Sequence, residues 1–106
     1  MIELDIFSDT VCPWCYIGKK RLDKAISNHK DTKFKQTWRP FQLNPGMPPD
    51  GMDRQEYLIS KFGSADAAKT IYDNIYDVGL VEGINFNFDS IMTTPNSFNS
   101  HRLLAL

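Results

Sequence analysis

Apolar and polar residues alternate at the start of the chain and then change to a helical spacing. Ile2, Leu4 and Ile6 share one face of an extended segment, which predicts a strand over residues 2–7. Over residues 13–27 apolar residues recur at helical spacing, and the proline at the first of these positions suits a helix start. The pattern therefore predicts a strand followed by a helix.

A second apolar segment, residues 33–41, predicts another strand. Phe34 and Trp38 share a face of it, and Pro40 ends its hydrogen-bond ladder or places it at an edge. The chain between the two strands is long enough for a crossover helix, and strands joined in this way run parallel. We therefore predict a right-handed parallel βαβ unit.

A loop rich in proline and glycine is predicted over residues 44–51. Asp53 and Glu56 follow it at the spacing of a capping box, with aspartate in place of the usual serine or threonine. They predict the start of a helix, and Gly63 is placed to end it.

Two further helices are predicted in the last part of the chain. One runs over residues 65–78, with Gly79 as its C-cap. Residues 80–92 are predicted to be extended and irregular. The last helix begins near Asn96 or Ser97, with Asn96 as a candidate N-cap.

The predicted elements look incomplete as a fold. The chain ends on the apolar run 103–106 without a helix stop signal, and a parallel pair of strands normally needs more strands and cover on both faces. We therefore expect these residues to be the N-terminal part of a longer protein, or to complete their sheet with another chain. By themselves they are expected to self-associate or to be unstable.

Composition and charge narrow the function classes. The 106 residues are 42% hydrophobic and 24% charged with a net charge of −1, as in one small globular domain without the basic excess that nucleic acid or an anionic membrane would favour. No apolar stretch approaches a membrane span, and the N-terminus lacks the pattern of a signal peptide. A cytoplasmic location is expected.

The two cysteines, Cys12 and Cys15, enclose Pro13 and Trp14 directly after the first predicted strand. Thiols one helical turn apart can close and reopen a disulfide. At a helix start, unpaired backbone N–H groups and the helix dipole favour the thiolate, which is the reactive form, so we expect a lowered pKa for Cys12. The placement predicts redox chemistry, with Cys12 as the candidate nucleophile.

Two other interpretations of the motif stay open. A structural zinc site needs four ligands, and the other candidates, His29 and His101, are isolated, so no metal is predicted. His101 is expected to be a satisfied or solvent-facing side chain rather than a base. A purely structural disulfide would close so short a loop that it would add little stability.

Three segments, residues 6–18, 38–45 and 94–103, together resemble the DsbA-like thioredoxin superfamily. The nearest part of it is the cytosolic FrnE-like subgroup, which is related to 2-hydroxychromene-2-carboxylate isomerases. The resemblance implies an α/β fold, a thioredoxin-like βαβ unit followed by an inserted helical domain. Residues 1–45 would be the first part, 46–106 would begin the insert, and the C-terminal half of the thioredoxin fold would be absent.

The resemblance also implies roles for residues. Cys12 would be the nucleophilic and Cys15 the resolving cysteine of a disulfide oxidoreductase, with no cofactor beyond their own disulfide. The partners would be thiol- or disulfide-containing proteins or small molecules. Pro13 and Trp14 belong to the motif, and Asn96 lies in a segment that resembles one facing the family's cleft. No residue here fits the family's cis-proline.

Two other function classes remain. Related isomerases and kappa-class glutathione transferases hold glutathione at the same turn, typically with serine where Cys12 stands. Glutathione is therefore a candidate cosubstrate. A non-catalytic interaction module is the third class, since the rest of the catalytic half is absent.

Overall fold

The computed structural model describes residues 1–106 and divides them into two compact units. The first unit comprises residues 1–43 and 97–106, and the second comprises residues 44–96. The division into domains 1–45 and 46–106 concerns the longer fold of the family and stays a prediction.

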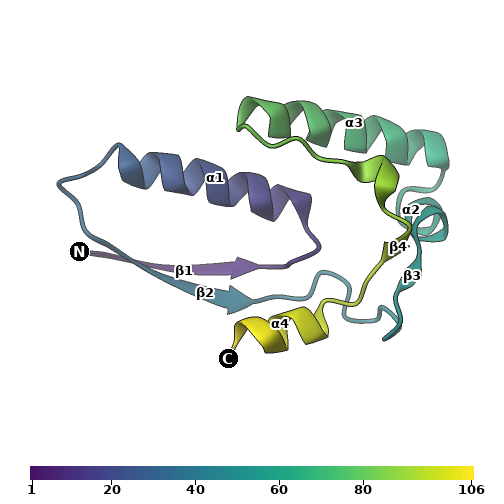
Figure 1. Ribbon diagram of the computed structural model, residues 1–106, viewed down its shortest axis with the longest axis horizontal. Coiled ribbons are helices and arrows are strands. Elements are labelled where there is room, and N and C mark those ends of the chain that lie inside the picture. Colours follow the sequence, from purple (N-terminus) through teal and green to yellow (C-terminus); the bar gives the residue numbers. More distant parts are fainter. The chain divides into compact units, whose positions relative to one another are not determined.

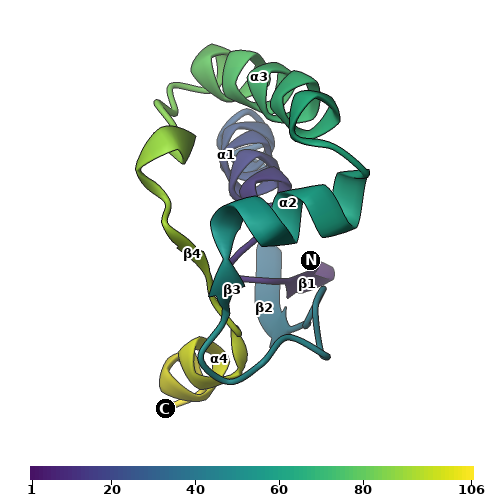
Figure 2. The same ribbon diagram turned by 90° about the vertical axis from the view of Figure 1, so that its right-hand side faces the viewer.

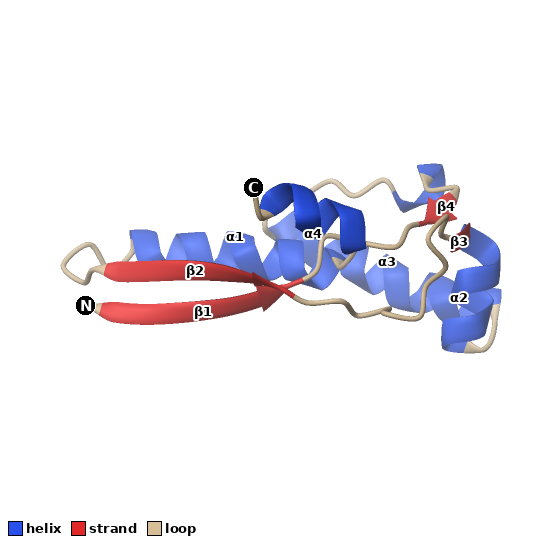
Figure 3. Cartoon of the chain, turned by 90° about the horizontal axis from the view of Figure 1, so that it is seen from below, coloured by secondary structure: helices blue, strands red, loops and turns tan.

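The first unit is built on a parallel βαβ arrangement. Strand β1 spans Ile2–Ser8, helix α1 spans Pro13–Ser27 and strand β2 spans Phe34–Pro40. The two strands run in the same direction with Ile2 opposite Phe34, as Figure 3 shows. The predicted strands, the helix and their parallel pairing are confirmed.

Helix α1 covers one face of the strand pair (Figure 1). Ile17 of this helix is the most buried large side chain, and Leu4 and Ile6 of β1 are half-buried. On the opposite face the Arg39 guanidinium forms an exposed ion pair with Asp5 at 3.2 Å. The alternation of β1 therefore gives one face to the core, as the sequence pattern predicted.

Helix α4, Phe98–Leu104, belongs to the first unit and lies beside the carboxyl end of β2 (Figure 1). Its N-cap position is held by Ser97, whose side chain makes no capping bond to the helix because its hydroxyl bonds to the carboxylate of Asp9. The prediction of Asn96 as the N-cap is wrong, because its side-chain amide donates instead to the carbonyl of Met47 at 2.7 Å.

The second unit consists mainly of helices α2, Arg54–Phe62, and α3, Ala65–Val81. Two short strands, β3 at Met52–Asp53 and β4 at Thr93–Thr94, pair antiparallel beside α2 (Figure 2). A single 3₁₀ turn, η1, spans Phe88–Ser90. The two short strands and this turn were not predicted from the sequence.

The local signals at the ends of α2 are confirmed. The Asp53 carboxylate accepts the N–H of Glu56 at 3.1 Å, which satisfies one of the free donors at the helix start. Gly63 ends the helix with a φ of 91°, a left-handed conformation that glycine adopts without steric cost.

The predicted end of α3 at Gly79 is wrong, because the helix continues to Val81. Gly79 is buried, and a Cβ atom built on it would lie 2.7 Å from the ring of Phe86. That ring stacks on Phe88 at a centroid distance of 4.9 Å. The absence of a side chain at Gly79 therefore allows the Phe86 ring to pack against helix α3, and the glycine does not form a turn.

We predict that Gly79→Ala destabilises the protein by roughly 1–3 kcal/mol, because the added methyl group overpacks the contact with Phe86. Gly18→Ala is the matched control, since Gly18 also lies inside a helix but has nothing within 4 Å of its Cβ position. Alanine there should stabilise by up to about 1 kcal/mol through helix propensity alone. Urea unfolding of both variants measures the contrast, and equal effects would contradict it.

Candidate active site

Cys12 is the N-cap of α1, and its thiol faces the first turn of the helix. The Sγ atom accepts the N–H of Cys15 at 3.4 Å, and the Cys12 carbonyl accepts the same N–H at 3.1 Å. The Cys12 N–H itself donates to the carbonyl of Asp9 at 3.3 Å, which closes the turn from β1 into α1. Both cysteines are free thiols and half-buried, so the predicted pair lies together at the helix start.

The expected lowering of the Cys12 pKa is wrong. Burial of the thiol is the main cause that raises its pKa above the ordinary value of 9.0, and a hydrogen bond with the Cys15 thiol adds to the rise. The N–H groups of Cys15 and Trp14 act in the opposite direction but do not outweigh burial. The helix start therefore supplies the predicted N–H donors, but removal of the sulfur from water has the larger effect on the Cys12 pKa.

The two residues between the cysteines form the start of α1. Pro13 is its first residue, where its missing N–H costs no helical hydrogen bond. Trp14 is 45% exposed and carries a large apolar surface directly beside the thiols. This is the placement that contact with an apolar part of a substrate would require.

The structure adds Asp9, which the sequence patterns do not single out. Asp9 is only 3% exposed, and its carboxylate accepts the N–H of Leu43 at 2.8 Å and lies 3.1 Å from Nε2 of His101. The hydroxyl of Ser97 and the N–H of Val11 also bond to it. Nothing local indicated this cluster, because its partners lie up to 92 positions away.

The charge on Asp9 follows from these contacts. Burial acts to raise the carboxyl pKa, but hydrogen bonds from Leu43, Ser97, Val11 and His101 outweigh it and hold the pKa below its ordinary value of 3.8. Asp9 is therefore an ionised carboxylate inside the first unit at neutral pH. His101 is satisfied, as predicted, since Nε2 also lies 3.0 Å from the carbonyl of Phe41.

Asn96 belongs to the second unit, where its amide binds the Met47 carbonyl, so its contact with a substrate stays a prediction. No cluster of three or more histidine, cysteine or acidic side chains is arranged to hold a metal ion. None of the helices combines the length and apolar character that a membrane crossing requires.

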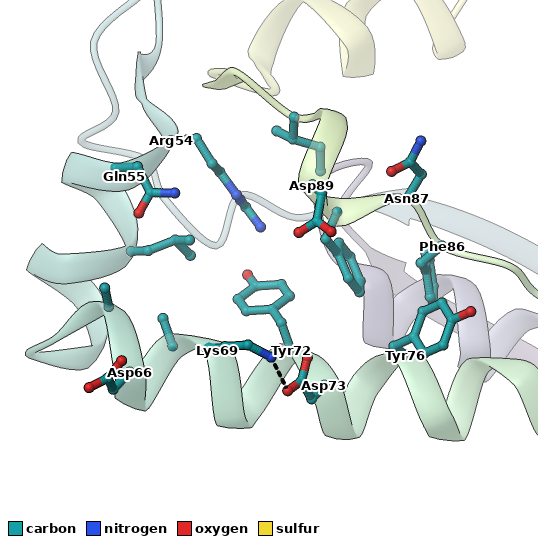
Figure 4. Close-up of a pocket in the computed structure, with 15 residues that line it drawn as sticks. Arg54, Gln55, Asp66, Lys69, Tyr72, Asp73, Tyr76, Phe86, Asn87 and Asp89 are labelled. Atoms are coloured by element: carbon teal, nitrogen blue, oxygen red, sulfur yellow. Dashed lines mark hydrogen bonds and ion pairs between the residues drawn. The ribbon is translucent and has the colours of Figure 1, made fainter.

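A cavity of about 560 Å³ lies within the second unit, between α2, α3 and the segment around η1 (Figure 4). Arg54 and Asp89 enter it from opposite sides, and the Arg54 guanidinium lies 4.8 Å from the ring centre of Tyr72. Lys69 on its wall is paired with Asp73 at 2.7 Å. The cavity contains no cysteine and no histidine, so it has neither a thiol nor an imidazole for catalysis.

Comparisons with known proteins identify the family. The family model of the DSBA-like thioredoxin domain matches residues 3–106. The crystal structure of a probable DsbA oxidoreductase from Streptomyces coelicolor superposes with a TM-score of 0.83 at 31% identity, covering 99% of this chain and 46% of that one. An uncharacterized protein of Bacillus subtilis, YwbO, is 38% identical over 48 residues, which is 45% of this chain and 22% of YwbO.

The chain thus spans less than half the length of the proteins that it matches. Within that span the match covers both units, including the turn that carries Cys12 and Cys15. The parallel βαβ unit and the helices after it agree with a DsbA-like thioredoxin fold. The chain belongs to the DSBA-like thioredoxin domain family, a family of thiol–disulfide oxidoreductases.

Proposed function

We propose that the intact protein exchanges disulfides with thiol- or disulfide-containing substrates through Cys12 and Cys15. The observation that carries the proposal is the position of the Cys12 sulfur at the N-terminus of α1, where it accepts the N–H of Cys15. The same hydrogen bond would stabilise a thiolate as it forms, because a negative sulfur is a stronger acceptor than a neutral one. Membership of the DSBA-like family supports the same chemistry.

The reaction runs through a mixed disulfide. In the reductive direction, the Cys12 thiolate attacks one sulfur of a substrate disulfide, forms a new S–S bond and releases the other sulfur as a thiolate that takes up a proton. The Cys15 sulfur, after losing its proton, then attacks Cys12 and releases the second substrate thiol. The substrate gains two electrons and two protons, and the protein is left with a Cys12–Cys15 disulfide. The oxidative direction is the reverse.

The two residues between the cysteines have supporting roles in this proposal. Pro13 fixes the first turn of α1, and the exposed face of Trp14 would contact an apolar part of the substrate beside the reacting sulfur. We further propose that the protein is cytoplasmic and that its two cysteines cycle between the dithiol and the disulfide. Disulfides are rare in cytosolic proteins, and those that form there are usually transient and catalytic.

The test is reduction of insulin by the intact protein with dithiothreitol as electron donor, alongside conjugation of glutathione to 1-chloro-2,4-dinitrobenzene. We expect insulin reduction that is lost after the protein is reduced and alkylated, and no conjugation above background. Conjugation without insulin reduction would overturn the proposal in favour of a glutathione-dependent enzyme. The absence of both activities would favour a non-catalytic interaction module.

A further inference from the structure

The buried carboxylate of Asp9 binds four donors that come from separate parts of the first unit. Val11 belongs to the active-site turn, Leu43 follows β2, and Ser97 and His101 come from the N-cap and the body of α4. Because Asp9 is 3% exposed, water cannot replace a donor that is removed. The position of residue 9 therefore depends on all of them.

The two partners of His101 show which of its ring nitrogens carries a hydrogen. Its Nε2 atom lies 3.1 Å from an Asp9 carboxylate oxygen and 3.0 Å from the Phe41 carbonyl oxygen. Both partners are acceptors, so Nε2 must carry the hydrogen. His101 consequently donates toward the active-site turn and the carboxyl end of β2 at the same time.

The backbone of Asp9 extends this arrangement to the reactive cysteine. The main-chain carbonyl of Asp9 accepts the Cys12 N–H at 3.3 Å. Asp9 therefore links His101, which it contacts through its side chain, to Cys12, which it contacts through its main chain. The hydroxyls of Thr10 in the same turn and Ser100 in α4 also lie 2.7 Å apart, but this contact is exposed, so water can replace it.

We propose that His101 is a positioning residue for the active-site turn, acting through Asp9 to keep Cys12 at the N-terminus of α1. The inference rests on the proposed function, because it concerns the geometry from which Cys12 would react. A misplacement of about 1 Å at a reacting centre can cost up to about 100-fold in rate. His101 thereby influences exchange without touching the substrate.

The experiment compares two replacements in the intact protein. His101→Gln keeps an N–H donor near the position of Nε2, whereas His101→Phe keeps the ring volume without a donor. We expect the phenylalanine variant to reduce insulin about 10-fold more slowly, and the glutamine variant to stay within about threefold of wild type. If His101 contributed only packing, the order of the two variants would be reversed.

Amide hydrogen exchange supplies a local measurement that does not depend on activity. In His101→Phe the amides of Cys12 and Leu43 should exchange about 10-fold faster, while amides in the middle of α1 stay unchanged. Ser100→Ala is the control on the same helix, because it removes the contacts of the hydroxyl with Thr10 and with the Ser97 carbonyl but none of the four Asp9 donors. Its Cys12 and Leu43 amides should exchange within about threefold of wild type.

The outcomes separate this inference from the proposed function. An inactive wild type would sink the proposed function, while the amide measurement would still decide whether His101 holds the turn. Wild-type protection of Cys12 and Leu43 in His101→Phe would overturn the inference. Should His101→Phe fail to fold, His101→Leu removes the same donor with a smaller side chain, and unchanged protection of the same amides there would count equally against it.

Discussion

Cys12→Ser should reduce disulfide exchange by at least about 10³-fold, whereas Cys15→Ser should stop the reaction after its first step. The two cysteines differ in their backbone setting: Cys12 precedes the helix and its sulfur accepts an N–H from the first turn, while Cys15 lies inside the helix and supplies that N–H. From this asymmetry we expect Cys12 to be the nucleophile and Cys15 the resolving cysteine.

Mass spectrometry separates the two steps. The reduced Cys15→Ser variant, incubated with a peptide disulfide, should accumulate a mixed disulfide at residue 12, because no second thiol can displace the peptide. Cys12→Ser should give at least about 10-fold less adduct, which would have to form at Cys15. Equal adducts, or an adduct on Cys12→Ser alone, would refute the assignment. Unchanged circular dichroism of both variants is the control for folding.

The elements that the sequence predicted well are those whose signals are local. Helix α1 was predicted with the boundaries that it has, because a proline opens it and its apolar stripe lies within 15 consecutive residues. The ends of α2 follow in the same way from Asp53 and Gly63, each of which acts on atoms within four positions. Local propensity and tertiary structure agree at these places.

The features that the sequence missed depend on contacts between distant residues. In the sequence Gly79 resembles the end of a helix. In the structure it lies inside the helix, where the ring of Phe86 from the following segment leaves no space for a Cβ atom. Strand β3 is two residues long and pairs with β4 about 40 positions later, so neither segment shows a periodic pattern.

The candidate site shows the same division. The Cys12–Cys15 pair is a contiguous motif, and it could be found by inspection of the sequence. Asp9 and His101 are 92 positions apart, and neither carries a local mark of burial. The direction of the Cys12 pKa was also out of reach, because it depends on how far the folded chain removes the sulfur from water.

Asp9→Asn should destabilise the first unit by roughly 3–5 kcal/mol. The asparagine side chain keeps one oxygen acceptor, so its NH2 group would face one of two donors that now find a carboxylate oxygen, either the Leu43 N–H at 2.8 Å or His101 Nε2 at 3.1 Å. Since the whole free energy of unfolding of a domain is about 5–15 kcal/mol, a loss of this size would bring the unit close to unfolding.

The matched control is Asp5→Asn. Asp5 also carries a carboxylate next to a cation, Arg39 at 3.2 Å, but its side chain is 59% exposed. An exposed pair contributes about 0–1 kcal/mol, so this variant should unfold at nearly the wild-type urea concentration. Similar losses for the two variants would show that burial of the Asp9 carboxylate is not what stabilises the unit.

The difference between wild type and Asp9→Asn should depend on pH in a defined direction. The folded state holds the Asp9 pKa below its ordinary value of 3.8, so the unfolded state binds the proton more readily. The stabilisation from the carboxylate is therefore fully present above about pH 4 and is lost as the pH falls through the folded-state pKa. Urea unfolding at pH 6 and pH 3 should show the gap between the two proteins narrowing at the lower pH. Because the other carboxyl groups titrate in both proteins, a gap that stayed constant or widened would contradict an ionised Asp9 in the folded protein.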